Sequence, residues 1–464
     1  MKRYDLCVIG SGPGGRRLAR EAAGLGRSAV VVERMEVVGG VAVNTGTIPS
    51  KALREAVMTI ARRGDPLAPP GRPSAEGATI EELLGHCNRI VEKEIAIIER
   101  QLAAEGVDLV QGSARLLGGS RLRVEGSGAS AEIEADRIAI AVGTEPARPA
   151  GIPFDGQSVI TSDDLLAMER LPRSMLVVGG GVIGSEYTSI FAQLGVRVTL
   201  VEGRERLLGF VDQEIGEALQ YQLRGAGVTL RLGEKVERIR TARLGGKPAV
   251  EAGLASGKTL RAESLLYCVG RRGATDGLGL SAAGLEADSR GRISVDGDYR
   301  TSNPDVWAVG DVIGFPALAS TAMEQGRVAA RRMFGEPAEP LPELFPFGIY
   351  TIPEISMVGP GEAELTAGAV PYESGTARYG EIARAQLLGD ESGMLKLLVH
   401  QSSHELLGVH AIGTGATELI HIGQLAIAFG ATVEYLAEAI FNYPTLAECY
   451  KVAARDALDR LRSS

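Results

Sequence analysis

Two glycine-rich turns are the segments of this sequence whose residue types and spacing best suit a chemical role. Gly10–Gly15 and Gly179–Gly184 each follow a short apolar run and precede a helical pattern. Glycines with this spacing let the backbone approach a pyrophosphate, and the following helix points its partly positive N-terminus at the phosphate. An acidic residue ends the next apolar run of each unit, Glu33 in the first and Glu202 in the second. Such a carboxylate accepts hydrogen bonds from the ribose hydroxyls of a dinucleotide.

Each turn must be positioned by a strand–helix–strand unit. In the first unit an apolar run ends at Ile9, a helical stretch continues to about Gly24, and a second apolar run ends at Glu33. The same pattern returns around the second turn, so we predict two dinucleotide sites in one chain. The glycines expected to contact nucleotides are Gly10, Gly12 and Gly15 in the first unit, and Gly179, Gly181 and Gly184 in the second. Between the units, apolar residues at helical spacing predict a long helix from about Thr79 to Glu105.

The composition excludes several classes of function. The chain has 464 residues, enough for about three domains, and its net charge of −9 argues against binding to nucleic-acid phosphates. No apolar run approaches the roughly 20 residues of a membrane-spanning helix, so we expect a cytoplasmic protein without membrane contact. The histidines show no spacing of metal ligands such as HExxH, and we predict no metal site.

A further acidic residue, Asp311, follows the apolar run Val306–Val309 and Gly310. A carboxylate at a strand end can accept hydrogen bonds from the ribityl chain of a flavin. The same carboxylate can instead cap the helix that follows it. The residues alone leave both interpretations open.

Motifs spread over the whole chain resemble, in their order, those of the flavoprotein disulfide reductases. That family includes dihydrolipoamide dehydrogenase, glutathione reductase and mercuric reductase. The motifs are Gly10–Gly15, Gly46–Lys51, Gly143–Thr144, Gly179–Gly184, Gly310–Asp311 and Tyr443–Thr445. The resemblance implies an α/β fold with two Rossmann-like dinucleotide-binding domains, one for FAD and one for NAD(P), plus a C-terminal α+β dimerisation domain. It also implies one non-covalent FAD per subunit, and a homodimer or larger homo-oligomer whose sites combine residues of both subunits.

The same resemblance implies where the domains and cofactor contacts lie. The FAD domain would be discontinuous (1–148 and 271–341) and interrupted by an NAD(P) domain (149–270), and an interface domain (342–464) would follow. FAD would contact the first glycine turn, Glu33, Gly143 and Asp311, whereas NAD(P) would contact the second turn, Glu202 and Gly270. Lys51 and Glu186 would meet as an ion pair beside the flavin, on the nicotinamide side. The residues alone also allow two unrelated charges, whose pairing at an exposed surface would contribute at most about 1 kcal/mol.

The sequence lacks the redox-active cysteine pair of the disulfide reductases. Ala42 and Thr47 occupy the two positions. A thiol relay needs a thiolate and a partner sulfur, and neither side chain supplies one. Tyr443 stands where the family places the histidine base of that relay, while Glu448 keeps its family position. We therefore expect no disulfide reduction, and we place Thr47, Tyr443 and Glu448 with Lys51 and Glu186 among the catalytic candidates.

The four cysteines offer no obvious replacement for the missing pair. Cys7 and Cys268 lie in apolar runs and Cys87 on an apolar helix face, which favours core positions. Cys449 follows Glu448 directly, and its role stays open.

The segment Gly46–Leu53 resembles a branch of the family without the cysteine pair, the soluble pyridine nucleotide transhydrogenases. Further similar stretches are Gly181–Tyr187, Arg206–Leu208, Gly310–Gly314, Gly348–Glu354 and Phe441–Thr445. This resemblance implies hydride transfer from NADPH to the flavin and then to NAD⁺ in the same site, with no sulfur involved. Two alternatives stay open: small side chains at Ala42 and Thr47 leave room for a quinone, dye or oxygen as acceptor, and a flavin-binding redox sensor would not turn over.

Nucleotide preference depends on the end of the second unit. A carboxylate at Glu202 binds ribose hydroxyls and repels a 2′-phosphate, by on the order of 4 kcal/mol per charge pair at about 4 Å. Arg204 and Arg206 follow at once, and either could pair with the phosphate and offset this repulsion. Alternatively, both are solvated loop residues. Glu202 thus favours NADH, whereas a phosphate contact from Arg204 or Arg206 would allow NADPH.

Overall fold

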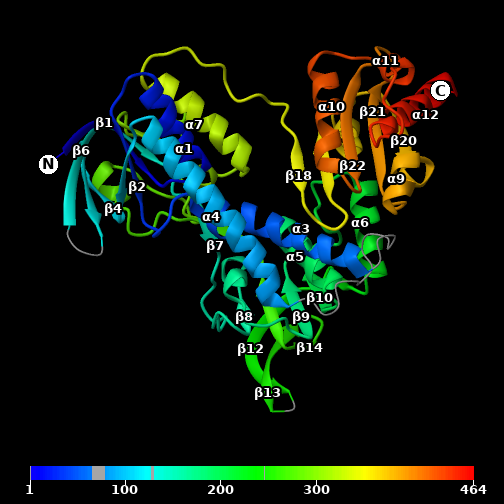
Figure 1. The fold of residues 1–464 in the computed structure, drawn as a ribbon, viewed down its shortest axis with the longest axis horizontal. Helices are drawn as coiled ribbons and strands as arrows, with labels where there is room; N and C mark the ends of the chain where they lie inside the picture. The colour runs from blue at the N-terminus through cyan, green and yellow to red at the C-terminus, as the bar shows by residue number, and fades with distance from the viewer. Residues whose placement is uncertain (1, 65–78, 127–129, 245, 464) are drawn as a thin grey trace.

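The computed structural model describes residues 2–64, 79–126, 130–244 and 246–463. It contains three main β-sheets with flanking helices (Figure 1). The first sheet lies at the left of the view, the second below the centre, and the third, with the C-terminus, at the right. Helices α3 (Thr47–Gly64) and α4 (Ile80–Ala104) pack on each other and run from the first region toward the second.

The first sheet has seven strands in the order β3-β2-β1-β6-β5-β4, with β17 beside β6. Its parallel strands are β1 (Lys2–Ile9), β2 (Ala29–Glu33), β3 (Asp108–Gln111), β6 (Ser130–Ile140) and β17 (Val306–Ala308). Antiparallel β4 (Ser113–Gly118) and β5 (Arg121–Glu125) complete it. Helices α1 (Pro13–Gly24) and α7 (Ala319–Met333) pack together, and α1 also contacts β1 and β2. Because β17 returns from far along the chain, this region is built from two separate segments.

The second sheet is fully parallel, in the order β11-β10-β9-β15-β8. Its strands are β8 (Val159–Ile160), β9 (Ser174–Val178), β10 (Arg197–Glu202), β11 (Thr229–Leu232) and β15 (Ser264–Tyr267), and its helices are α5 (Val182–Gln193) and α6 (Gln213–Gly225). An antiparallel sheet of β12 (Val236–Leu244), β13 (Lys247–Leu254) and β14 (Thr259–Ala262) extends from it. Strands β7 (Thr144–Pro146) and β16 (Arg271–Gly273) pair where the chain passes between the first two regions.

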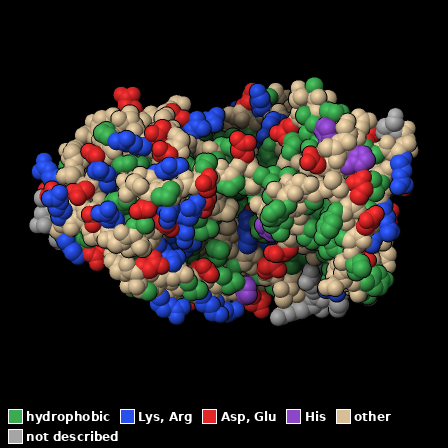
Figure 2. All heavy atoms as spheres, turned by 90° about the horizontal axis from the view of Figure 1, so that it is seen from above, with side chains coloured by type: hydrophobic (Ala, Val, Ile, Leu, Met, Phe, Trp, Pro, Cys, Tyr) green, Lys and Arg blue, Asp and Glu red, His purple; other side chains and the backbone are tan. Residues whose placement is uncertain are grey.

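The third sheet is antiparallel, in the order β18-β19-β22-β21-β20. Its strands are β18 (Phe347–Ile349), β19 (Ile355–Val358), β20 (Tyr372–Arg378), β21 (Met394–His400) and β22 (Leu406–Ile412). Its helices are α8 (Glu362–Ala367), α9 (Ala383–Leu388), α10 (Ala416–Ala428), α11 (Val433–Glu438) and α12 (Glu448–Ser463). Figure 2 shows hydrophobic side chains gathered on the half of the molecule that holds this region. Exposed apolar residues there include Leu425, Phe429, Tyr435, Ile440 and Tyr443.

The two glycine turns have matching local geometry. Gly10 and Gly179 open them with φ angles of +104° and +103°, which L side chains rarely adopt. A Cβ on Gly15 would lie 2.1 Å from the Gly10 carbonyl oxygen, and one on Gly184 would lie 1.9 Å from that of Gly179. Only glycine allows each helix to start this close to its strand, and the internal repeat is therefore confirmed.

The predicted fold class is confirmed: two Rossmann-like units precede an α+β region. The long helix expected from about Thr79 to Glu105 is α4, which Thr79 caps by accepting a hydrogen bond from the Glu82 amide at 3.2 Å. Short elements complete the architecture: α2 (Gly40–Asn44) and the 3₁₀ helices η1 (Ser162–Ala167), η2 (Leu280–Ala283), η3 (Asp311–Ile313) and η4 (Tyr379–Glu381). The domain boundaries given above stay predictions. Within the described residues, no helix combines the length and apolar character needed to span a membrane.

Candidate active site

A cavity of about 1040 Å³ lies where the three regions meet. The first glycine turn and the ends of α2 and α3 form part of its wall, α5 forms another part, and the third region contributes residues of β18 and α10. Among the predicted site residues, those that border it are Gly10, Gly12, Glu33, Thr47, Lys51, Gly143, Glu186 and Asp311. Gly15 lies behind the turn, against Gly10.

Glu33 is held at the end of β2 by the glycine turn itself. Its side chain is buried, and one carboxylate oxygen accepts hydrogen bonds from the Ser11 amide at 2.9 Å and the Ser11 hydroxyl at 2.6 Å. The other oxygen accepts from the Met35 amide at 2.9 Å. The turn and the acid therefore form one rigid unit at the cavity wall.

Asp311 faces the cavity and does not cap the helix that it begins. The Thr144 hydroxyl donates to its carboxylate at 3.3 Å, and the Arg271 guanidinium donates to that hydroxyl at 2.8 Å. No side-chain hydrogen bond caps η3. Burial raises the pKa of Asp311, although the charge of Arg271 opposes the shift. Asp311 therefore lies at the cavity wall, and its contact with the ribityl chain of a flavin stays a prediction.

The cavity wall fits an FAD molecule. Glycine backbone at the start of α1 suits a pyrophosphate, while Glu33 and Asp311 supply carboxylates for ribose and ribityl hydroxyls. A Cβ on Gly40 would come within 3.0 Å of Gly12 Cα, so this part of the wall is bare backbone. The Thr45 hydroxyl borders the same cavity and is buried without a hydrogen-bond partner among the described residues. An orphaned buried hydroxyl of this kind calls for a polar ligand.

Lys51 and Glu186 form the ion pair that the resemblance implies. Lys51 Nζ lies 3.0 and 2.9 Å from the two carboxylate oxygens of Glu186, and both residues border the cavity. Tyr350, from the end of β18, supports both partners. Its amide donates to Glu186 at 2.8 Å, and its ring lies 4.8 Å from Lys51 Nζ. A cation is therefore fixed at the cavity wall by contacts from all three regions of the chain.

Glu202 ends β10 and closes the second glycine turn in the way that Glu33 closes the first. One of its oxygens accepts from the Gly180 amide at 2.6 Å, and the other accepts from the Arg204 amide at 2.9 Å and from Arg204 Nε at 3.0 Å. Burial acts to raise the pKa of Glu202, but these hydrogen bonds outweigh it and lower the pKa. Arg206 instead donates to the neutral Gln213 side chain at 3.1 Å. Both arginines are exposed, and each has a side-chain partner, so a contact with a 2′-phosphate stays a prediction.

The second turn lies beside the cavity and not in its wall. Gly179, Gly181, Gly184, Glu202, Arg204 and Gly270 do not border it, whereas the first turn of α5 does through Val182 and Ile183. Glu186 lies one helical turn further along α5 and borders the cavity, so this helix connects the second glycine turn to the cavity wall. A dinucleotide held at the second turn can thus extend along α5 toward Lys51.

The remaining catalytic candidates divide into two groups. Ala42 and Thr47 border the cavity beside Lys51. Tyr443 is 76% exposed on the third region, Glu448 begins α12, and neither borders the cavity. One chain therefore does not bring Tyr443 and Glu448 to the site.

The cysteines supply no thiolate. Cys7, Cys87 and Cys449 are fully buried, and burial raises the pKa of Cys7, Cys268 and Cys449 to about 12 and that of Cys87 to about 11. All four are free. In the part of the chain that the structure describes, no cluster of three or more His, Cys, Asp or Glu side chains is placed to hold a metal ion.

Sequence reasoning missed several residues of the site. Tyr350 belongs to a stretch used for the resemblance, but no role follows from its position in the sequence. Arg271 and Thr144 reach Asp311 only through the pairing of β7 and β16. His421 borders the same cavity from α10.

Comparisons with known proteins agree with this geometry. Residues 4–326 match the family model of the pyridine nucleotide-disulphide oxidoreductases, and residues 345–454 match the dimerisation domain of the same family. The chain is 48% identical to the soluble pyridine nucleotide transhydrogenase of Mycobacterium tuberculosis, covering 100% of this chain and 99% of that protein, and 43% identical to that of a Marinomonas species, covering 99% of each.

Two solved structures share the fold over nearly the whole chain. The flavoprotein disulfide reductase RclA of Escherichia coli superposes with a TM-score of 0.88 at 26% identity, covering 97% of this chain and 99% of that one. LpdA of Mycobacterium tuberculosis gives a TM-score of 0.87 at 27% identity, covering 98% and 99%. With its two glycine turns, its three regions and these matches, the chain belongs to the pyridine nucleotide-disulphide oxidoreductase family.

Proposed function

We propose that this chain is a flavoprotein oxidoreductase that transfers hydride from NADPH to NAD⁺, without a disulfide relay. The observation that carries the proposal is the Lys51–Glu186 pair at a cavity whose wall holds Ala42 and Thr47 in place of thiols. The relatives that match along their full length bear the name of pyridine nucleotide transhydrogenases, which supports the same reaction.

Bound FAD would supply the hydride acceptor and donor, taking hydride from a reduced nicotinamide and giving it to an oxidised one. The residues of the chain would hold the cofactor in place and stabilise the charge that develops during transfer. Lys51 would present a positive charge where negative charge develops, while Glu186 and Tyr350 hold that charge in a single position. The first glycine turn, Glu33, Gly143 and Asp311 would hold FAD.

Both nicotinamide nucleotides would use the second glycine turn, one after the other. Glu202 would accept hydrogen bonds from the adenosine ribose. Arg204 neutralises part of the charge of Glu202 through two hydrogen bonds, which lessens the repulsion of a 2′-phosphate. Arg206 has no carboxylate within 4.0 Å among the described residues, so its charge is available to that phosphate. With Glu202 for the ribose and Arg206 for the 2′-phosphate, one site would accept both NADH and NADPH.

We also propose that the enzyme is a cytoplasmic homodimer. The family match to a dimerisation domain and the exposed apolar side chains of the third region support the dimer. Tyr443 and Glu448 would then border the cavity of the second copy.

Anaerobic turnover of the purified holoenzyme tests the reaction. NADPH with thio-NAD⁺ as acceptor is compared with NADH and a benzoquinone. Fast reduction of thio-NAD⁺ is expected. Negligible thio-NAD⁺ reduction beside brisk quinone reduction would instead make Ala42 and Thr47 the wall of a quinone site.

A further inference from the structure

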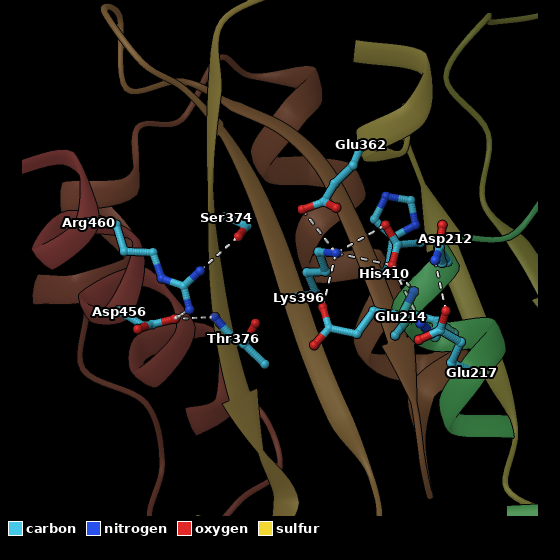
Figure 3. Close-up of polar contacts among 12 residues, drawn as sticks. Asp212, Glu214, Glu217, Glu362, Ser374, Thr376, Lys396, His410, Asp456 and Arg460 are labelled. Atoms are coloured by element: carbon cyan, nitrogen blue, oxygen red, sulfur yellow. Dashed lines mark hydrogen bonds and ion pairs between the residues drawn. The ribbon is translucent and has the colours of Figure 1, made fainter. Parts of the chain in front are cut away.

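A buried lysine of the third region reaches into the nucleotide-binding region. The Lys396 side chain, on β21, is 2% exposed, and its Nζ lies 3.2 Å from each carboxylate oxygen of Asp212 (Figure 3). Glu214 and Glu362 complete the cluster at 3.1 and 3.2 Å. Burial acts to lower the pKa of Lys396, but the three carboxylates outweigh it and raise the pKa. The ammonium is therefore charged, and it is the shared partner of two separate regions.

The contact between Lys396 and Asp212 holds the start of α6 in place. It is the N-cap of that helix, and one of its oxygens accepts from the Glu214 amide at 3.1 Å. The same carboxylate is bonded to Lys396 across the boundary between the regions. Lys396 thus fixes the point at which the chain leaves the β10–α6 loop, residues 203–211, and enters the helix.

That loop carries the two arginines of the candidate nucleotide site. Arg204, near its start, is fixed by Glu202, and its carbonyl accepts from the Gly233 amide at 2.8 Å. Arg206 has a different support, because its guanidinium is bonded to Gln213, the first residue of α6 and the neighbour of Asp212. The position of Arg206 therefore depends on the end of α6 that Lys396 holds.

The loop also needs external support. Leu208 adopts a left-handed backbone conformation with a φ of +47°, and such strain persists only where the surroundings enforce it. The ring of Phe210 meets that of Phe347, on β18, at 5.3 Å between centroids. The third region thus contacts Phe210 near the end of the loop and Asp212 directly after it.

We propose that Lys396 is a positioning residue for nucleotide selection: through Asp212 it holds Arg206 in place for the 2′-phosphate of NADPH. The proposal deepens the proposed function and rests on it. Loss of Lys396 should weaken NADPH binding more than NADH binding, because Arg204 and Glu202 keep their own bonds.

The test uses FAD-loaded full-length enzyme with Lys396→Met, which keeps the volume of the side chain and removes its charge. Dissociation constants for NADP⁺ and NAD⁺ are measured from the change in flavin fluorescence. We expect an about tenfold loss for NADP⁺ and at most about twofold for NAD⁺, the size of one lost charge-assisted contact. Flavin reduction by reduced nicotinamide mononucleotide, which lacks the adenosine, should keep its wild-type rate.

Two further variants separate positioning from stability. Asp212→Asn keeps a good N-cap but weakens the bond to Lys396, and it should shift NADP⁺ binding in the same direction. Glu362→Gln leaves the Lys396–Asp212 contact intact and should bind both nucleotides as the wild type does. Thermal melting of each variant shows whether the protein is folded. If Lys396→Met does not fold, the binding measurements with Asp212→Asn test the proposal.

Hydrogen exchange of the nucleotide-free enzyme supplies a readout that needs no activity. Amides of residues 203–211 should exchange faster in Lys396→Met and Asp212→Asn, while those of 40–51 should not change. Equal loss of NADP⁺ and NAD⁺ binding, or unchanged binding with unchanged exchange, would overturn the proposal. If the wild type binds neither nucleotide, the proposed function fails, and with it the selection role. The exchange data would then report only whether the anchor exists.

Discussion

Lys51 and Glu186 are 135 residues apart and form a two-oxygen ion pair at the wall of the cavity. Lys51 comes from α3 and Glu186 from α5, the helix that follows the second glycine turn. Tyr350 adds a bond from the third region. Because each region contributes one element, the charge at the cavity wall depends on the arrangement of the whole chain.

Replacing Lys51 with alanine should slow flavin reduction by NADH about 100-fold while FAD stays bound, because a preorganised cation is lost where charge develops. Stopped-flow absorbance at the flavin band measures the rate. Lys93→Ala, at an exposed position of α4, is the matched control and should behave as the wild type. An unchanged rate in Lys51→Ala would remove Lys51 from the reaction.

The ring of Tyr350 should matter more than its hydroxyl. Tyr350→Leu removes the aromatic face beside Lys51 but keeps the amide that donates to Glu186. A lost cation–π contact predicts an about 3- to 30-fold slower flavin reduction. Tyr350→Phe keeps the ring and should stay close to wild type. Equal effects of both changes would point to the hydroxyl instead.

Glu202 and Arg204 should have opposite effects on nucleotide preference. Glu202→Ala removes the carboxylate that repels a 2′-phosphate, so the ratio of kcat/KM for NADPH to that for NADH should rise about tenfold. Arg204→Ala exposes an uncompensated Glu202 and should lower the same ratio. Steady-state kinetics with NADPH and NADH measure this ratio. If neither substitution changes it, both residues lie outside the ribose site.

Stability should fall in mild acid because of His410, which lies opposite Lys396 in the third sheet (Figure 3). Burial lowers its pKa, while Asp212 of α6 and Glu364 of α8 oppose the shift and Lys396 adds to it. An unfolded histidine titrates near 6.5, so below about that pH the unfolded state binds more protons than the folded one. This contribution to stability is thus present above about pH 6.5 and lost as the pH falls.

His410→Gln isolates this effect, since glutamine can still donate to the Pro360 carbonyl that His410 Nε2 contacts at 3.0 Å. Melting temperatures between pH 5 and 8 should depend less on pH in this variant. His400→Gln, at the end of the neighbouring strand, is the control. Identical pH profiles for His410→Gln and wild type would refute the assignment.

The two nucleotide-binding units could be predicted because their signals are local. Gly10, Gly15 and Glu33 lie in one continuous segment, and the backbone geometry that each requires is a property of that segment. Helix α4 could be predicted in the same way, from apolar residues at helical spacing within one segment. Lys51 and Glu186 could be paired only by resemblance, since no local pattern connects two helices so far apart.

Contacts between the three regions could not be predicted from local sequence patterns. Lys396 stands in a strand pattern, where a lysine usually faces solvent, and its burial depends on carboxylates from α6 and α8. Tyr350 contacts Glu186 through its backbone amide, a contact that does not depend on the type of side chain and so cannot be predicted from it. For Tyr443 and Glu448 the resemblance implies a place in the site, but in a single chain Tyr443 is exposed, Glu448 is half-buried, and neither borders the cavity.

Hydride transfer through a flavin with no redox-active thiol predicts a simple stoichiometry in an anaerobic titration. The holoenzyme is titrated with NADPH while the flavin absorbance is followed, and NAD⁺ is then added. We predict complete bleaching at about one equivalent of NADPH per flavin, followed by full recovery of the absorbance on addition of NAD⁺. Uptake of about two equivalents, with a dithiol titratable afterwards, would instead show that a thiol pair takes part in the reaction.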